Sequence, residues 1–118
     1  MLLPLLYILI PSQILLIAPM PAFVEAYVTA YSATETSRHN PGGLNAMGLK
    51  PQWLDVACPR GLRLGQRVEI MGYPFICRDR YAKWLDDERD LPTFDIFSTD
   101  YRSALDFGIQ KVRVRIIN

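Results

Sequence analysis

Few of the groups that carry metal or phosphate chemistry occur in this sequence. Histidine occurs once, at His39, and the two cysteines, Cys58 and Cys77, do not have zinc-ligand spacing. There is no glycine-rich phosphate loop, dinucleotide fingerprint or H-E-x-x-H motif. The net charge of +1 lacks the basic excess of a nucleic-acid-binding protein. We therefore expect no metal site and no nucleic-acid partner, and we expect His39 to be an exposed loop residue.

Charged residues are absent from the first 24 positions of the chain. The two apolar runs there are short for a membrane span, and four prolines would break a long helix. Val24-Glu25-Ala26 resembles the small-x-small site of an export signal, although a basic start is missing. The prolines also argue against a buried core segment. We assign residues 1–26 to a signal peptide that is removed or to a membrane anchor that is kept, and residues 27–118 to one domain.

The remaining chain has the pattern of short β-strands. QRVEI and YPFICRD flank Met71-Gly72 and predict a hairpin, with Pro74 at an edge or bulge. KVRVRII alternates strictly, which predicts valines and Ile116 facing inward and the three basic residues facing outward. AYVTAYS, WLDVA and TFDIF are further expected strands. This pattern is typical of a small closed β-barrel in a mostly β fold.

One helix is expected before the last strand. Ser98 or Thr99 would cap it, and Gly108 would end it after Phe107. The carboxylate of Asp100 would lie in the first turn, where the helix dipole favours a negative charge. Tyr101, Ala104 and Leu105 have helical spacing and predict one apolar face.

Two aspartates stand in apolar strand-like runs, Asp79 after FIC and Asp95 within FDIF. Partial burial of Asp95 among aromatic residues would raise its pKa, as a general acid requires. Alternatively, both aspartates face solvent or cap turns. The charged residues between them, 86–90, predict a solvated loop. Among possible sugar contacts, Trp53 is expected in the core, and Trp84 is the better candidate.

Six segments in order resemble the three-aspartate (3D) domain of bacterial and phage cell-wall proteins. They are VTAYS, NAMG, ACPRGLRLGQRVEI, YPFICRDR, FDIF and SALDFGIQKVRVRII, and together they cover about Tyr27 to Ile117. That family is related to membrane-bound lytic transglycosylase A and to Gram-positive stationary-phase and spore muralytic proteins. The resemblance implies a small six-stranded double-psi β-barrel with one short helix before the last strand.

The resemblance also implies a set of site residues. Asp79 matches the family's middle aspartate and Asp95 its last, which acts as the acid and base. The implied substrate-binding residues are Thr29, Tyr31, Asn45, Arg80 and Trp84.

Three departures from the family pattern stand beside these matches. Cys58 stands where the family has its first aspartate, and we expect Asp55, three residues earlier, on a different part of the strand. Arg80 and Tyr81 replace the turn that often follows the middle aspartate. Cys58 and Cys77 would form a disulfide at the groove wall or remain two free thiols.

The implied activity is cleavage of peptidoglycan glycan strands between N-acetylmuramic acid and N-acetylglucosamine, with a 1,6-anhydro product and no cofactor. The implied protein is an exported monomer, extracellular, periplasmic or wall-associated, that touches a membrane only through an uncleaved N-terminal segment. The alternative is a non-catalytic barrel that binds peptidoglycan or a protein. A weaker alternative is a soluble, phage-encoded wall-modifying protein.

Overall fold

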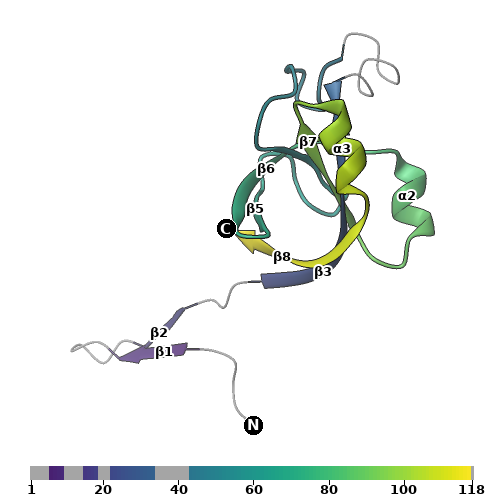
Figure 1. Ribbon diagram of the computed structural model, residues 1–118. Coiled ribbons are helices and arrows are strands. Elements are labelled where there is room, and N and C mark those ends of the chain that lie inside the picture. The colour runs from purple at the N-terminus through teal and green to yellow at the C-terminus, as the bar shows by residue number, and fades with distance from the viewer. Residues whose placement is uncertain (1–5, 10–14, 19–21, 34–42, 118) are drawn as a thin grey trace.

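Six strands close into a β-barrel in the computed structural model (Figure 1), which describes residues 6–9, 15–18, 22–33 and 43–117. The order around the barrel is β3-β7-β4-β6-β5-β8. The bounds of these strands are β3 Ala22–Ser32, β4 Asp55–Ala57, β5 Arg67–Ile70, β6 Tyr73–Asp79, β7 Thr93–Ser98 and β8 Gln110–Ile117. The mostly β, six-stranded barrel expected for this chain is confirmed.

The barrel mixes parallel and antiparallel neighbours. β3 pairs with β7 and β4 with β6 in parallel, whereas the other four neighbouring pairs are antiparallel. Parallel pairs need long connections, because the chain must return to the same end of the sheet. The chain from β4 to β6 passes through β5, and the chain from β3 to β7 passes through β4, β5 and β6. The segments before β4 and between β6 and β7 both contribute to the candidate site described below.

The barrel interior is filled by alternate residues of the strands. Val28, Val56, Phe94 and Val114 each have at most 1% of their surface exposed and belong to one hydrophobic cluster. In β8 the expected alternation is confirmed: Val112 and Ile116 pack against the same core, while Lys111 and Arg113 are exposed. Residues that point away from this core therefore form the outer face of the barrel wall.

The β5–β6 hairpin turns where the sequence predicts it. Met71 and Gly72 both have positive φ, 51° and 85°. Two consecutive left-handed residues match the right-handed twist of the flanking strands. Pro74 lies opposite Glu69 of β5, before β6 begins to pair with β4, so its missing N–H breaks no ladder on that side.

Two helices of the described part of the chain lie outside the barrel, α2 (Lys83–Glu88) and α3 (Tyr101–Phe107). Residues 86–88 of α2 were predicted to be a solvated loop. Asp87 and Glu88 are exposed as predicted, but the three residues are helical, so the loop assignment is wrong for them. α3 begins later than expected, because Asp100 rather than Ser98 or Thr99 caps it. The predicted apolar face is also largely wrong: Ala104 is buried, but Tyr101 and Leu105 are exposed.

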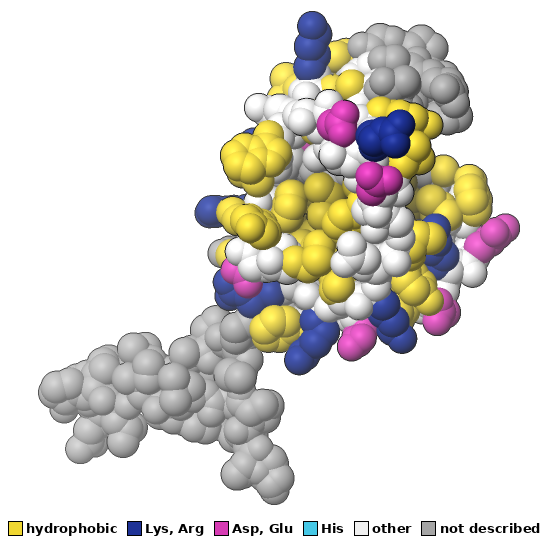
Figure 2. Space-filling model, in the orientation of Figure 1, with side chains coloured by type: hydrophobic (Ala, Val, Ile, Leu, Met, Phe, Trp, Pro, Cys, Tyr) yellow, Lys and Arg dark blue, Asp and Glu magenta, His cyan; other side chains and the backbone are white. Residues whose placement is uncertain are grey.

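Trp53 is a further correction at the residue level. It was expected in the core of a strand, but it lies in the turn before β4 and is 73% exposed. The strand starts only at Asp55, because the positive φ of Leu54 (74°) belongs to the turn. On the face drawn in Figure 2, basic and acidic side chains are interspersed.

β3 begins at Ala22, before the domain boundary at residue 27 that the sequence predicted. Residues 22–26, assigned above to the apolar N-terminal segment, pair with β8, and Ala26 is fully buried in the core. Upstream, β1 (Leu6–Leu9) and β2 (Leu15–Ala18) form an antiparallel pair. None of the described helices is long and apolar enough to cross a membrane. His39 lies outside the described residues.

Candidate functional site

The candidate site lies on the outer face of the wall formed by β3, β7, β4 and β6. Ala57 of β4 is the common neighbour of the two aspartates: Asp95 of β7 lies opposite it on one side and Asp79 of β6 on the other. Adjacent strands are about 4.8 Å apart, so the two backbones are separated by roughly 10 Å. Since Phe94 and Ile96 pack on the core, Asp95 between them points outward.

A β-bulge turns Asp79 to the same outer face. Val56 pairs with Cys77, but Ala57 pairs with Asp79, so Arg78 is an extra residue on β6. Cys77 is fully buried in the core, and regular alternation would have pointed Asp79 into the core as well. The extra residue shifts the alternation by one, and Asp79 points outward with Arg78.

Three donors hold the carboxylate of Asp79. Tyr31 donates its hydroxyl over 2.8 Å, and the backbone N–H groups of Ala46 and Arg80 donate over 3.1 and 2.8 Å. Burial and then Asp79 raise the pKa of Tyr31, with smaller contributions from the charges of Asp95 and Asp55. Tyr31 therefore stays protonated as a donor to Asp79.

Asp95 has a different set of neighbours. It lies beside Thr29 in the parallel β3–β7 pair, and the Thr29 hydroxyl donates to its carboxylate over 2.7 Å. Asp95 is half-buried. Thr29 and Tyr31 were both expected to line the groove, and both contact the aspartates assigned to the site.

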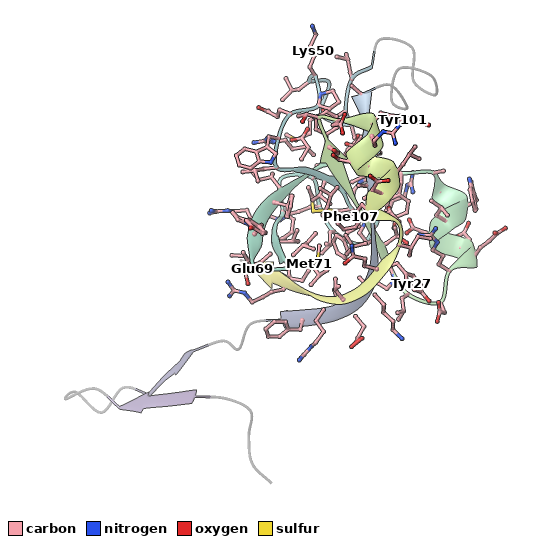
Figure 3. All side chains as sticks on the ribbon, in the orientation of Figure 1. Tyr27, Lys50, Glu69, Met71, Tyr101 and Phe107 are labelled. Atoms are coloured by element: carbon pink, nitrogen blue, oxygen red, sulfur yellow. A yellow bond between two sulfur atoms is a disulfide. The ribbon has the colours of Figure 1, made fainter. Side chains whose placement is uncertain are left out.

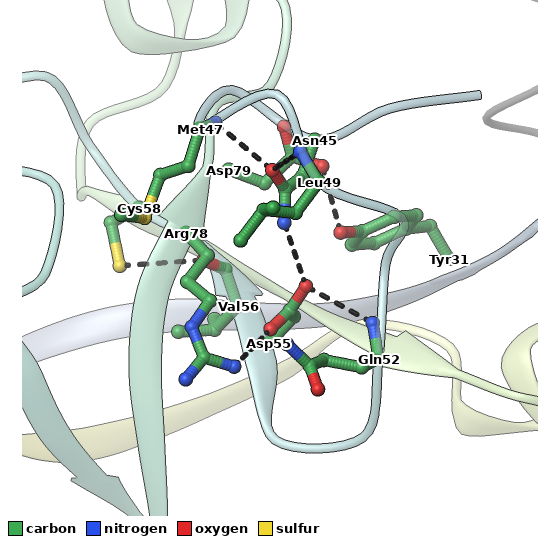
Figure 4. Close-up of polar contacts among 10 residues, drawn as sticks. All are labelled: Tyr31, Asn45, Met47, Leu49, Gln52, Asp55, Val56, Cys58, Arg78 and Asp79. Atoms are coloured by element: carbon green, nitrogen blue, oxygen red, sulfur yellow. Dashed lines mark hydrogen bonds and ion pairs between the residues drawn. The ribbon is translucent and has the colours of Figure 1, made fainter. Parts of the chain in front are cut away.

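Asp55 is a third aspartate of this region, three residues before Cys58. It is fully buried on β4, two residues before Ala57 and so on the same outer face. Its carboxylate pairs with the Arg78 guanidinium at 2.9 Å (Figure 4). The Asn45 side-chain amide and the Gln52 N–H also donate to it, each over 3.1 Å. As expected, Asp55 lies on a different part of the strand from Cys58: it begins β4, whereas Cys58 follows the end of the strand and packs in the core.

Asn45, an expected substrate contact, is buried and organises the loop over the site. Its amide nitrogen contacts Asp55, while its oxygen accepts from the backbone N–H groups of Met47 and Leu49 at 2.9 and 3.0 Å (Figure 4). This geometry presents the neighbouring N–H of Ala46 to Asp79. Asn45 therefore orients this loop and is too buried to line the surface of the site.

Arg80 directly follows Asp79, and Trp84 lies on α2. The Arg80 guanidinium donates to backbone oxygens of the segment after β4, at 3.1 Å to Cys58 and 2.8 Å to Pro59. These contacts stabilise that segment and occupy part of the guanidinium. Trp84 on α2 is 58% exposed, and its ring is available to a ligand.

Cys58 and Cys77 form a disulfide, which decides between the two alternatives left open by the sequence. Both residues are fully buried in the core. The bond ties the end of β4 to β6, and the Cys58 N–H donates to the Asp79 backbone oxygen at 3.1 Å. Cys58, which stands where the family has its first aspartate, therefore stabilises the backbone of Asp79.

A row of hydroxyl–carboxylate pairs follows β3 along this face. Tyr31 donates to Asp79 and Thr29 to Asp95, and Tyr27 donates to Asp90 over 2.8 Å. The three donors alternate along one strand, so they share one face. The Tyr27–Asp90 pair was missed by the sequence interpretation. The Y-x-T-x-Y spacing in YVTAY was the signal that could have found its donor.

Among the described residues, no group of three or more histidine, cysteine or acidic side chains is arranged to hold a metal ion. No family model matches the chain, and no curated protein matches it.

Proposed function

We propose that this protein is a peptidoglycan-cleaving enzyme of the lytic transglycosylase type, with Asp95 as the acid and base. The observation that carries the proposal is the position of Asp79 and Asp95 on either side of Ala57, on one outer face. Carboxylates on opposite faces of the wall could not act on one bond. Here the charges of Asp79 and Asp95 both raise the pKa of Tyr31.

The barrel topology supports the same proposal. Two parallel pairs, β3–β7 and β4–β6, are joined by antiparallel neighbours into a closed six-stranded barrel. This arrangement is consistent with the double-psi type of barrel that the resemblance to the three-aspartate domain implies. We propose that the barrel is of that type.

The different environments of the two aspartates support different roles. Asp79 accepts hydrogen bonds from the Tyr31 hydroxyl and from the backbone N–H groups of Ala46 and Arg80. We assign it to stabilising positive charge that develops on the sugar ring and to keeping a proton on its neighbour. Asp95 is half-buried and accepts a hydrogen bond from the Thr29 hydroxyl, and we assign it as the general acid.

The reaction needs one carboxyl group and no added reactant. Protonated Asp95 gives its proton to the bridging oxygen as the bond between N-acetylmuramic acid and N-acetylglucosamine breaks. The resulting carboxylate takes the proton of the muramic acid C6 hydroxyl, whose oxygen bonds to C1 and closes the 1,6-anhydro ring. Asp95 ends protonated as it began. Unlike in two-carboxylate hydrolysis, no water is consumed.

A second candidate function is binding of peptidoglycan without cleavage. Two observations favour it. Cys58, which stands where the family has its first aspartate, is in a buried disulfide, and the nearby Asp55 is buried and paired with Arg78. Neither offers a carboxylate to a substrate.

Incubation of the full chain with purified peptidoglycan, followed by mass spectrometry of the soluble products, tests both candidates. We expect anhydro-muropeptides from the wild type and none from Asp95→Asn. Asp87→Asn on exposed α2 is the matched control and should behave as wild type. Equal product from Asp95→Asn would reject the assignment of the acid. Co-sedimentation with peptidoglycan without product from any form would favour the binding module.

A further inference from the structure

The row of hydroxyl–carboxylate pairs on β3 leads into a pocket beyond the two aspartates of the proposed active site. The pocket has a volume of about 340 Å³ and is lined by Tyr27, Glu88, Arg89, Asp90 and Ile109. This volume lies within the range of small-molecule sites. Tyr27 lies on the side of the barrel next to α2 (Figure 3). We call it the Tyr27 pocket.

We infer that the Tyr27 pocket binds a further N-acetylated sugar of the same glycan strand whose bond is cleaved at Asp95, an inference that rests on the proposed function. The first argument is continuity. Tyr27 is two residues before Thr29 on β3, and Thr93 is two residues before Asp95 on β7. Each step of two residues covers roughly 6.6 Å on one face, so the pocket continues the line of the site.

The second argument is that contacts among the lining residues hold them in place. The Arg89 guanidinium lies over the Tyr27 ring, 5.8 Å from its centre, and donates to the Thr93 hydroxyl at 2.9 Å. The Tyr27 hydroxyl is held by Asp90, and this hydrogen bond, more than any other cause, raises the pKa of Tyr27. These contacts orient the polar groups before a ligand arrives, which lowers the cost of binding.

The third argument is the chemistry of the lining. Carboxylates of Asp90 and Glu88 accept hydrogen bonds from sugar hydroxyls, and the guanidinium of Arg89 donates to an acetamido oxygen. Ile109 is 62% exposed and offers an apolar contact for the acetamido methyl group or the C–H face of the ring. Two carboxylates against one guanidinium disfavour phosphate and other anions. A neutral, hydroxyl-rich ring fits this set.

The inference is tested with the full chain and β-1,4-linked N-acetylglucosamine oligomers as probes, a disaccharide and a hexasaccharide, by calorimetry and by amide chemical shifts. We expect Tyr27→Phe and Asp90→Asn each to weaken hexasaccharide binding by about tenfold, as for loss of a hydrogen bond to a charged group, and to leave disaccharide binding unchanged. The amide signals of Arg89 and Ile109 should move only with the hexasaccharide.

Tyr73→Phe, at another exposed tyrosine, and Asp87→Asn are the matched controls and should bind both probes as wild type. Unchanged hexasaccharide binding in both pocket variants, or equal weakening for both probes, would overturn the inference. If anhydro-muropeptides form while the pocket variants bind the hexasaccharide normally, only the pocket assignment fails. If no probe binds and no product forms, the proposed function fails with it.

Discussion

At the scale of single residues, Asp55 is a buried carboxylate that needs an opposite charge and hydrogen bonds. Its carboxylate is fully buried, and removal from water disfavours a charge strongly unless it is paired and hydrogen-bonded. Arg78 supplies the opposite charge, and Asn45 and Gln52 supply hydrogen bonds. Because Arg78 is also the extra residue of the bulge, the same residue turns Asp79 outward and compensates Asp55.

Removal of the Arg78 charge should therefore destabilise the fold. We expect Arg78→Met to lower the free energy of unfolding by about 3 kcal/mol, because it leaves a buried carboxylate without its cation. Urea unfolding at neutral pH measures the change. The double variant Asp55→Asn, Arg78→Met should recover part of the loss, since the uncompensated charge is gone. A double variant less stable than Arg78→Met would contradict this account.

At the scale of elements, α3 shows how one side chain sets a helix start. The Asp100 carboxylate accepts from the N–H and the hydroxyl of Ser103 at 2.9 and 2.8 Å. These hydrogen bonds, the hydroxyl first, lower the pKa of Asp100 below its ordinary value of 3.8. A group whose pKa is lower in the folded state stabilises the fold above its unfolded pKa, and that contribution is lost as the pH falls through the folded value.

We expect Asp100→Ala to have a lower Tm than wild type at neutral pH, because α3 loses its cap. The difference should shrink as the pH is lowered below about 4, where wild-type Asp100 becomes protonated. Thermal unfolding followed by circular dichroism across this pH range measures it. Asp100→Ser is the control, since it keeps an acceptor that does not titrate. Its difference from Asp100→Ala should stay constant with pH, and a parallel decline would contradict the assignment.

At the scale of the whole molecule, β3 closes the barrel by pairing with two strands. Its later half pairs with β7, and its first half pairs with β8, from Ala22 opposite Ile116 to Val28 opposite Gln110. β8 in turn pairs with β5, where Arg115 and Glu69 form an ion pair at 3.2 Å. Closure of the barrel therefore depends on residues that precede Tyr27.

A chain that begins at Tyr27 should be less stable than one that begins at Ala22. The shorter chain loses the pairing of residues 22–26 with β8 and the buried side chain of Ala26, and it leaves an open edge on β8. We expect a loss on the order of 2–4 kcal/mol from these hydrogen bonds and buried area. Chemical unfolding of the two chains measures it. Equal stability would show that this half of β3 does not contribute to closure.

The sequence by itself determined the local features of this protein. Strict alternation determined which face of β8 enters the core, because one face of a strand is buried and the other is solvated. Met71-Gly72 determined the hairpin turn, because it accommodates two left-handed residues between strands. Asp79 and Asp95 stood out in apolar runs, and the resemblance to the three-aspartate domain pointed to Thr29 and Tyr31. The structure brings all four to one face.

Only the tertiary structure decided how these local features combine. Local alternation points Asp79 inward, and the pairing of β6 with β4, a strand distant along the chain, introduces the bulge that turns it outward. The same pairing brings Arg78 to Asp55, so that the buried carboxylate of Asp55 has an opposite charge beside it. Closure against β8 likewise brings residues 22–26 into the barrel, although their composition resembles an export segment. These outcomes depend on register between distant strands, which packing of the whole barrel sets and local sequence does not specify.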